Sequence, residues 1–320
     1  MLERTDFVKK QIVFYYPADG DKMSFKNDNM IITEKDGKTK LQVTCYRVFL
    51  VFVAGDTTIT TGLLNRSAKF GFSICLMNRN LKIYKYIGSR MEGNTYLRRI
   101  QYSYDGQQLA QRIVWNKIRN QRRALASTRQ NNEWAKEALC KLDTYLVQLE
   151  ENEFDKKSLL GIEGSASRVY FAHMFSNVNW KGRKPRIKAD YVNASLDIGY
   201  TVLFNIVDAL VNVYGFDEYQ GVYHTCFYMR KSLVCDLIEP FRPIIDYTTR
   251  KAINLGQFKA EDFIERNKRY SLEWKKSKKY TEIYLTEIMK RKEEIFLYIQ
   301  SYYRAFMKKK SSKEFPVFEY

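Results

Sequence analysis

A change in hydrophobic pattern near Arg98 divides this sequence into two parts that require different folds. Residues 1 to about 100 consist mainly of short β-prone runs separated by Asp, Gly and Lys, whereas apolar residues recur at helical spacing from Asp105 almost to the end. A chain of 320 residues is long enough for two domains that each bury a core. The sequence therefore predicts an α+β protein with a small β-sheet domain at residues 1–100 and a larger all-α domain at residues 101–320.

The predicted β domain contains one short helix and no cluster of polar residues that suggests chemistry. Val48–Val53 is a continuous apolar run, which predicts a central strand, and Asp36–Gly37 indicates a hairpin turn. Thr60 or Thr61 is placed to cap a short helix that Gly71 ends. Because this domain also lacks a strong basic cluster, we expect it to form the interface of a homodimer.

The polar residues that most suggest chemistry lie in the stretch Gly221–Asp246, within the helical part. It contains His224, one of two histidines in the chain, and places Asp236 and Glu239 three positions apart on a predicted helix. Residues at this spacing are neighbours, so both carboxylates could serve one site, and two prolines that follow should interrupt the helix. One imidazole with two carboxylates is ligation suited to Mg²⁺ or Mn²⁺.

A further acid, Glu163, lies upstream among glycine and small residues, where a charge on an otherwise apolar segment is costly. Together these stretches resemble the family of the CRISPR-associated integrase, the catalytic subunit of spacer acquisition. The resemblance covers most of the chain from Thr57 to Asp246, with four motifs in the family's order and at ordinary spacings. The motifs are IEGSASRVYF (162–171), DYVNASLDIGY (190–200), GVYH (221–224) and SLVCDLIEPFRPIID (232–246).

The resemblance implies that Glu163, His224 and Glu239 ligate a divalent metal, Mg²⁺ or Mn²⁺, and that Asp236 is a close supporting acid in the same catalytic site. Some members of the family use an aspartate as the second acidic ligand, so the division of roles between Asp236 and Glu239 is open. Ser167 stands where alanine is common in the family, and we expect it to lie away from the ligands.

The reaction that the resemblance implies is metal-assisted phosphoryl transfer in CRISPR adaptation, a step of antiviral defence. The 3′-hydroxyl of a captured DNA fragment would attack a phosphodiester at the repeat in the array, which makes the chain a metal-dependent DNA integrase and endonuclease. The family's dimers are usually bridged by a small second CRISPR-associated protein. Two alternatives are a metal nuclease without an integration role and a DNA-binding assembly subunit whose metal site is inactive.

The charge balance favours DNA as the partner. Lys and Arg number 54 against 36 Asp and Glu, a net charge of +18, and residues 266–310 carry 14 against five, which is half of that excess. Three arginines lie on one side of a helix predicted at residues 107–126, where a solvated face is an equally good interpretation. The loop 181–188 has five basic residues with Gly and Pro, which favours phosphate contact over a merely solvated loop.

Two further arginines match positions in the family and could hold phosphate oxygens or pair with the acids. The candidate DNA-binding residues are Arg112, Arg119, Arg123, Arg168, Lys181, Arg183, Lys184, Arg186 and Arg242.

Cysteine usage favours a cytoplasmic protein without a membrane. The five cysteines are scattered, odd in number and without C-x-x-C spacing, which is typical of reduced thiols. The sequence begins without an apolar signal core, and its longest apolar run, Val48–Ala54, is too short to span a membrane. A zinc site from His224, Cys226 and Cys235 lacks a fourth ligand, so we set it aside. His173 is expected to be structural.

Overall fold

The computed structural model describes residues 2–88, 94–128, 132–178, 180–185 and 187–320. It divides into two compact units, one of Met1–Gly93 with Asn212–Gly215 and one of the remaining residues from Asn94. A small β-sheet region precedes a mostly helical one, so the predicted α+β class is confirmed. The first helix after the β region, α3 (Thr95–Ser103), begins a few residues before the boundary that the sequence predicts.

The first unit contains two small sheets. In the four-stranded sheet the order is β1-β5-β6-β7, where β1, β5 and β6 are parallel and β7 is antiparallel to β6. The other sheet is an antiparallel meander, β2-β3-β4. The strands are β1 Gln11–Tyr15, β2 Lys22–Lys26, β3 Asn29–Thr33, β4 Thr39–Thr44, β5 Val48–Ala54, β6 Ser73–Met77 and β7 Ile83–Ile87.

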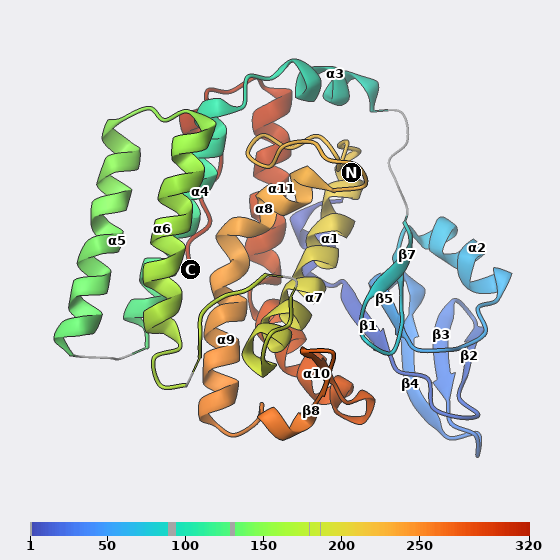
Figure 1. The fold of residues 1–320 in the computed structure, drawn as a ribbon. Coiled ribbons are helices and arrows are strands. Elements are labelled where there is room, and N and C mark those ends of the chain that lie inside the picture. The colour runs from blue at the N-terminus through green and yellow to red at the C-terminus, as the bar shows by residue number, and fades with distance from the viewer. Residues whose placement is uncertain (1, 89–93, 129–131, 179, 186) are drawn as a thin grey trace. The chain divides into compact units, whose positions relative to one another are not determined.

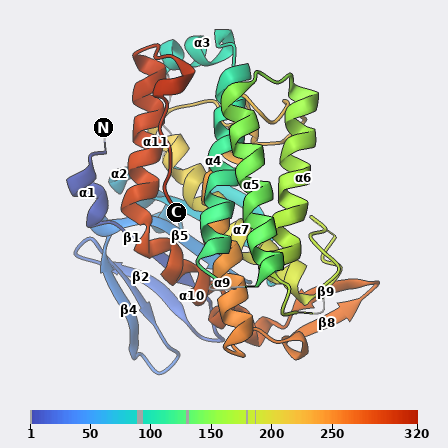
Figure 2. The same cartoon turned by 90° about the vertical axis from the view of Figure 1, so that its left-hand side faces the viewer.

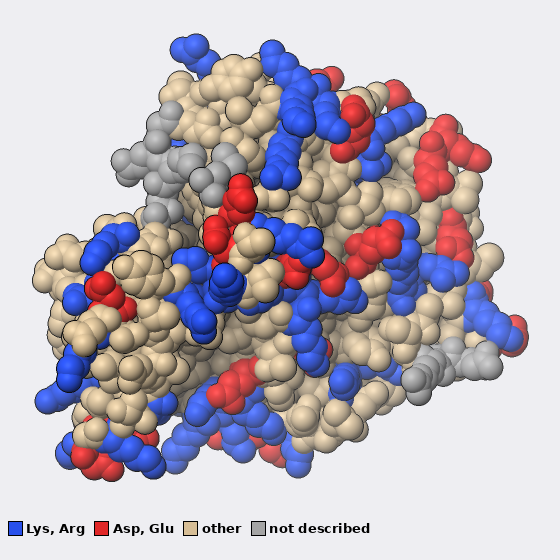
Figure 3. Space-filling view, turned by 180° about the vertical axis from the view of Figure 1, so that it is seen from behind, with Lys and Arg blue, Asp and Glu red and all other residues tan. Residues whose placement is uncertain are grey.

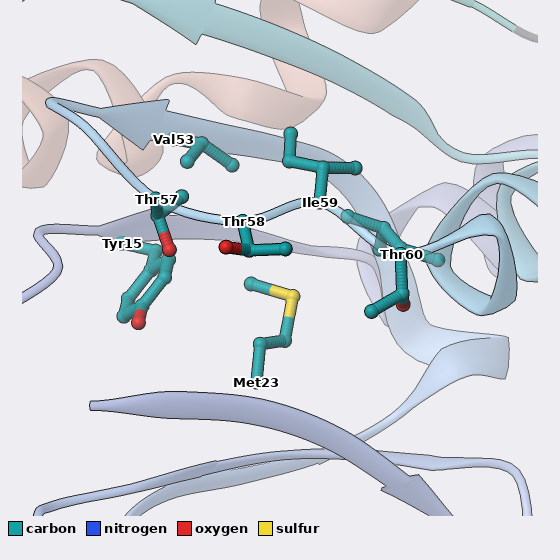
Figure 4. Close-up of a pocket in the computed structure, with 8 residues that line it drawn as sticks. Tyr15, Met23, Val53, Thr57, Thr58, Ile59 and Thr60 are labelled. Atoms are coloured by element: carbon teal, nitrogen blue, oxygen red, sulfur yellow. The ribbon is translucent and has the colours of Figure 1, made fainter. Parts of the chain in front are cut away.

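Local sequence signals explain most of this unit. All residues of β5 are buried, as its unbroken apolar sequence requires of an inner strand. Helix α2 (Thr61–Phe70) begins after Thr60 and ends at Gly71, whose left-handed φ of 69° avoids a steric cost for a side chain. The short helix α1 (Arg4–Val8) adds to the one helix that the sequence predicts. A hollow between Tyr15, Met23 and the segment 57–60 has room for about one water molecule (Figure 4).

The helices from residue 94 onward belong to the second unit, apart from the end of α7 at residues 212–214, and in this unit α4, α5 and α6 lie side by side (Figure 2). The bounds of α4 are those that its apolar period predicts. The helices are α3 Thr95–Ser103, α4 Gln107–Ala126, α5 Glu133–Glu151, α6 Lys156–Met174, α7 Tyr191–Tyr214, α8 Ser232–Ile238, α9 Arg242–Asn254, α10 Trp274–Lys290 and α11 Lys292–Met307.

A two-stranded hairpin interrupts the helices, so the expectation of an all-α second domain needs correction. β8 (Phe263–Arg266) pairs antiparallel with β9 (Arg269–Leu272). The two residues between them, Asn267 and Lys268, have φ of 51° and 59°, the left-handed pair that a tight hairpin turn requires. Helix α7 is long and apolar enough to cross a membrane, but 83% of its apolar window is buried inside the protein, as in the core helix of a folded domain.

The segment Phe315–Tyr320, here called the strap, runs along α4 (Figure 1). The buried amide of Asn116 donates to the Phe318 carbonyl (2.7 Å) and accepts from the Phe318 N–H (2.8 Å). Asn120 Nδ2 donates to the same carbonyl and to that of Pro240, each at 3.0 Å. Asn120 therefore joins α4 both to the strap and to the short 3₁₀ turn η2 (Glu239–Phe241), which carries Glu239.

Candidate active site

Asp236 is the centre of a tight loop-to-helix junction. Its fully buried carboxylate accepts backbone N–H bonds from Val222 (2.6 Å), Tyr223 (3.0 Å) and His224 (2.8 Å). It also accepts a 2.7 Å bond from His224 Nδ1. The loop comes so close that a Cβ on Gly221 would lie 2.6 Å from Asp236 Oδ2. Asp236 thus fixes the orientation of the imidazole through Nδ1. The other ring nitrogen, Nε2, is left as the atom that could bind a metal, which is the usual arrangement for a metal-ligating histidine.

Glu163 and Glu239 meet at the ammonium group of Lys117, which extends from α4. Lys117 Nζ lies 2.7 Å from Glu239 Oε2 and donates to Glu163 Oε1. The other oxygen of Glu239 accepts a 2.9 Å bond from Arg242 Nε. Ser167, one helical turn after Glu163, donates to Glu163 Oε1 at 3.1 Å, so the expectation that Ser167 lies away from the acids is wrong.

Electrostatics keep this cluster charged. Burial alone would raise the pKa of Glu239, but the positive charges of Arg242 and Lys117 outweigh it and lower that pKa to about 2. Burial alone would lower the pKa of Lys117, but the carboxylates of Glu239 and Glu163 outweigh it and the pKa is raised. Glu239 and Lys117 are therefore both ionised at neutral pH.

The donor atoms fit a hard divalent cation, although three ligands do not converge on one point. No group of three His, Cys, Asp or Glu side chains is placed to hold a metal within the described ranges. Glu163 and Glu239 nevertheless point at one cation, the Lys117 ammonium, and Glu239 Oε2 has no hydrogen bond beyond that ionic contact. Carboxylate oxygens with an imidazole nitrogen suit Mg²⁺ or Mn²⁺.

Asp236 and Glu239 have different partners in the structure, so their role in one shared site stays a prediction. A short helix ends between them at Ile238, and Glu239 begins the 3₁₀ turn η2, which Pro240 follows. Asp236 bonds to the 221–224 loop, whereas Glu239 pairs with Lys117. The prediction that the prolines interrupt the helix is confirmed.

Lys117 is the site residue that the sequence analysis missed. It follows Ile113 by four positions and Val114 by three, which places it on the apolar face of α4. Its side chain is only 9% exposed. A lysine on an apolar helical face needs acidic partners, so this position was a signal for a buried ion pair.

Three of the four arginines of α4 contact the strap. Arg119 pairs with Glu319 at 3.0 Å and Arg123 pairs with the same carboxylate at 3.5 Å. Arg112 Nε donates to the Phe315 carbonyl at 3.0 Å, and burial lowers its pKa. A segment some 200 residues away therefore engages all three arginines, and their role in DNA binding stays a prediction.

The basic loop is anchored beside the site through Arg183. This guanidinium is 13% exposed, pairs with Asp197 at 2.6 Å and lies 5.3 Å from the centre of the Tyr200 ring. Arg242 lies 4.7 Å from the same ring, so Tyr200 connects the loop to the partner of Glu239. Arg183 is thus held inside the protein, which argues against its predicted role as a free DNA contact.

Other predicted DNA-binding residues have exposed side chains, namely Arg168, Lys181 and Lys184. Arg186 lies outside the described residues. Lys and Arg are more abundant than Asp and Glu on the face drawn in Figure 3, in agreement with the net charge of +18.

Residues 15–286 match the protein family described as CRISPR associated protein Cas1. The match covers more than half of the chain. The chain belongs to the Cas1 family. CRISPR-associated endonuclease Cas1 2 of Rhodospirillum rubrum is 28% identical over 257 residues, covering 74% of this chain and 75% of the relative. CRISPR-associated endonuclease Cas1 1 of Thermodesulfovibrio yellowstonii is 31% identical over 254 residues, covering 75% of this chain and 77% of the relative.

Solved structures support the Cas1 fold. A Cas1 protein from Thermotoga maritima has a TM-score of 0.78 at 18% identity, covering 93% of this chain and 97% of that one. A Cas6-RT-Cas1–Cas2 complex has a TM-score of 0.78 at 22% identity and covers 97% of this chain and 36% of that one. A casposase bound to integration product has a TM-score of 0.75 at 16% identity, covering 94% of this chain and 91% of that one. At these identities the likeness establishes the fold alone.

Proposed function

We propose that this Cas1-family chain is a divalent-metal-dependent DNA endonuclease and integrase of CRISPR adaptation. It would join the 3′-hydroxyl of a captured fragment to a phosphodiester in the repeat array. The observation that carries the proposal is the convergence of Glu163 and Glu239, from two different elements, on one cation beside a histidine oriented by Asp236. Curated relatives named CRISPR-associated endonucleases and a fold neighbour bound to integration product support the same chemistry.

Each residue of the site has a separate role in this proposal. Glu163, Glu239 and the Nε2 atom of His224 would hold Mg²⁺ or Mn²⁺, which would lower the pKa of the attacking hydroxyl and offset charge on the phosphate. Asp236 positions the imidazole and the loop that carries it. Arg242 fixes the Glu239 carboxylate through Oε1 and leaves Oε2 for the cation.

The proposed substrates are the DNA fragment and the repeat array, held mainly through their phosphates by exposed basic residues. We also propose a homodimer through the N-terminal unit, with a small second CRISPR-associated protein bridging two dimers. A fold neighbour solved as a Cas1–Cas2 complex supports the bridging partner. Free cysteines support a cytoplasmic location. Light scattering on the full chain would show the mass of two copies, and a monomer at micromolar concentration would contradict the dimer.

The decisive test separates chemistry from DNA affinity. Glu163→Gln and Glu239→Gln preserve side-chain shape but remove the charge that a metal requires, so strand transfer in Mg²⁺ or Mn²⁺ should fall at least 100-fold. DNA affinity should change less than about threefold, because it depends on many distributed phosphate contacts. Glu137→Gln on α5 is the matched control, since Glu137 pairs with Lys141 at an exposed position, and it should retain full activity.

The products distinguish the proposed function from its alternatives. Covalent joining of a labelled fragment to a repeat-containing target indicates an integrase, whereas cleavage without joining indicates a nuclease. Binding without any product under Mg²⁺ or Mn²⁺ would favour an assembly subunit. Strand transfer at the wild-type rate in both Gln variants would show that Glu163 and Glu239 are not the catalytic acids.

A further inference from the structure

The cation between the two acids is part of the chain itself. Lys117 reaches from α4 to Glu163 on α6 and to Glu239 on η2, and its side chain is only 9% exposed. Burying an ammonium group is costly unless acids surround it, and here both acids are also the proposed metal ligands. Lys117 therefore satisfies Glu163 and Glu239 in the arrangement that the structure describes.

A divalent ion and this ammonium would compete for the same space. Lys117 Nζ lies 2.7 Å from Glu239 Oε2 and is also bonded to Glu163 Oε1. An ion bound to those two oxygens would lie about 2.0–2.6 Å from each, which is the space that Nζ occupies. The two positions cannot be filled together without moving the lysine.

The charges of these side chains also indicate that a metal ion and the Lys117 ammonium cannot both be present. Glu163 and Glu239 carry two negative charges, and Lys117 and Arg242 carry two positive ones, so the cluster is balanced without a metal. Adding a divalent cation while Lys117 remains in place would leave an excess of two positive charges among mostly buried groups. Withdrawal of Lys117 toward solvent would relieve half of that excess.

We propose that Lys117 is a tethered competitor for the metal site: its ammonium holds Glu163 and Glu239 together when no metal is bound, and divalent metal binding displaces it. This inference rests on the proposed metal-dependent function. The tether keeps α4, α6 and η2 in register in the absence of metal, and it lowers the apparent metal affinity by the cost of its own release. Metal occupancy then depends on the local metal concentration and on how readily Lys117 withdraws.

The first test is metal affinity in a charge-free variant. Lys117→Met keeps the unbranched stem and removes the ammonium, so the full chain should bind Mn²⁺ at least tenfold more tightly than wild type, measured by calorimetry or by the spin-resonance signal of free Mn²⁺. Lys141→Met on α5 removes a lysine from an exposed ion pair and should leave the Mn²⁺ affinity unchanged. Equal or weaker Mn²⁺ binding by Lys117→Met would overturn the inference.

Thermal unfolding separates competition from a purely structural role. In EDTA, Lys117→Met should melt below wild type because two acids lose their shared partner, and Mn²⁺ should raise its Tm by more than it raises that of wild type. A structural role alone would lower both melting temperatures and leave the Mn²⁺-induced rise unchanged. That parallel result would overturn the proposal.

The wild-type chain offers a test that needs no substitution. Acetylation of amines, followed by peptide mass spectrometry, should modify Lys117 slowly in EDTA and faster in saturating Mn²⁺, while Lys141 should react equally in both. Protection of Lys117 under both conditions would overturn displacement. If neither wild type nor Lys117→Met binds Mn²⁺, the metal site itself is wrong; if both bind it equally, only the role of Lys117 is wrong.

Discussion

Replacing Asp236 by Asn tests how the loop that carries His224 is held. The carboxylate accepts four hydrogen bonds, two at Oδ1 from His224 and two at Oδ2 from Val222 and Tyr223. An Asn side chain has one oxygen, so it can keep only one of these pairs. Its NH₂ group then faces either the two N–H donors of Val222 and Tyr223, or the His224 N–H and an imidazole that must move its proton to Nε2 to accept.

The expected loss of stability follows from the number of hydrogen bonds that Asn cannot keep. A hydrogen bond to a charged group is worth about 1.5–3 kcal/mol, so losing two of the four corresponds to about 3–6 kcal/mol. Movement of the loop away from the amide reduces the upper end, because residues 225–229 beyond His224 are exposed. We expect Asp236→Asn to lower the free energy of unfolding by about 3–5 kcal/mol and to abolish strand transfer, since the imidazole is no longer fixed.

Two measurements check this expectation. Urea unfolding at pH 7.5 gives the loss of stability, and hydrogen exchange should show the greatest loss of protection at the amides of residues 222–224. Asp246→Asn is the matched control, because Asp246 is also fully buried but accepts from the hydroxyls of Tyr170 and Tyr200. Hydroxyls can rotate to accept from an NH₂ group, so this change should be neutral or stabilising at pH 7.5.

The reasoning would be refuted by an Asp236→Asn protein with wild-type stability and unchanged protection at residues 222–224. That result would show that the loop is held by contacts other than the carboxylate. A large loss that is spread evenly over the chain, with normal His224 amide protection in the folded state, would contradict the assigned positioning role as well.

Three other predictions follow from charges in the same unit. Burial outweighs the tyrosine hydrogen bonds and raises the pKa of Asp246 from 3.8 to about 6, so the folded protein favours the protonated form of this carboxyl. The free energy of unfolding should therefore fall by up to about 3 kcal/mol as pH rises from about 4 to 6. Urea unfolding of wild type and of Asp246→Asn across this pH range isolates the contribution of Asp246. Glu319→Gln should free Arg119 and Arg123 for phosphates and tighten duplex binding severalfold in a titration, whereas unchanged affinity would show that these arginines do not face DNA. Wild-type DNA affinity should fall at least tenfold between about 50 and 200 mM salt, and a flat response would contradict phosphate-dominated binding.

Local signals in the sequence were sufficient for much of the fold. The spacing of apolar residues predicted where α4 begins and ends, and Thr60 and Gly71 predicted the two ends of α2. These predictions were possible because the ends of a helix depend on residues within a turn or two. The β8–β9 hairpin was missed because each strand has four residues and Asn267–Lys268 is not a strong turn pair. Strands this short depend on tertiary context more than on pattern.

The site was predictable in its residues but not in its contacts. The motif resemblance named Glu163, His224, Asp236 and Glu239 together, but spacing alone did not show that Asp236 binds His224 while Glu239 binds Lys117. The chain changes from α-helix to 3₁₀ turn between these two residues, which a helical spacing rule does not anticipate. The role of Lys117 was hidden by the large excess of lysine and arginine, since charge counts do not show which cation is buried.

The strap gives the assembly of this site a definite order in time. Asn116 and Phe318 are 202 positions apart, so during synthesis α4 leaves the ribosome long before the segment that satisfies its buried amides. Until then Asn116 lacks its partner Phe318, and Asn120 keeps only its bond to the Pro240 carbonyl of η2. Closing so long a loop is slow relative to local helix formation. A nascent chain that has already folded its β-sheet unit would therefore still lack the strap along α4, and the packing around Asn116 beside the proposed site is completed only after residues 315–320 have left the ribosome.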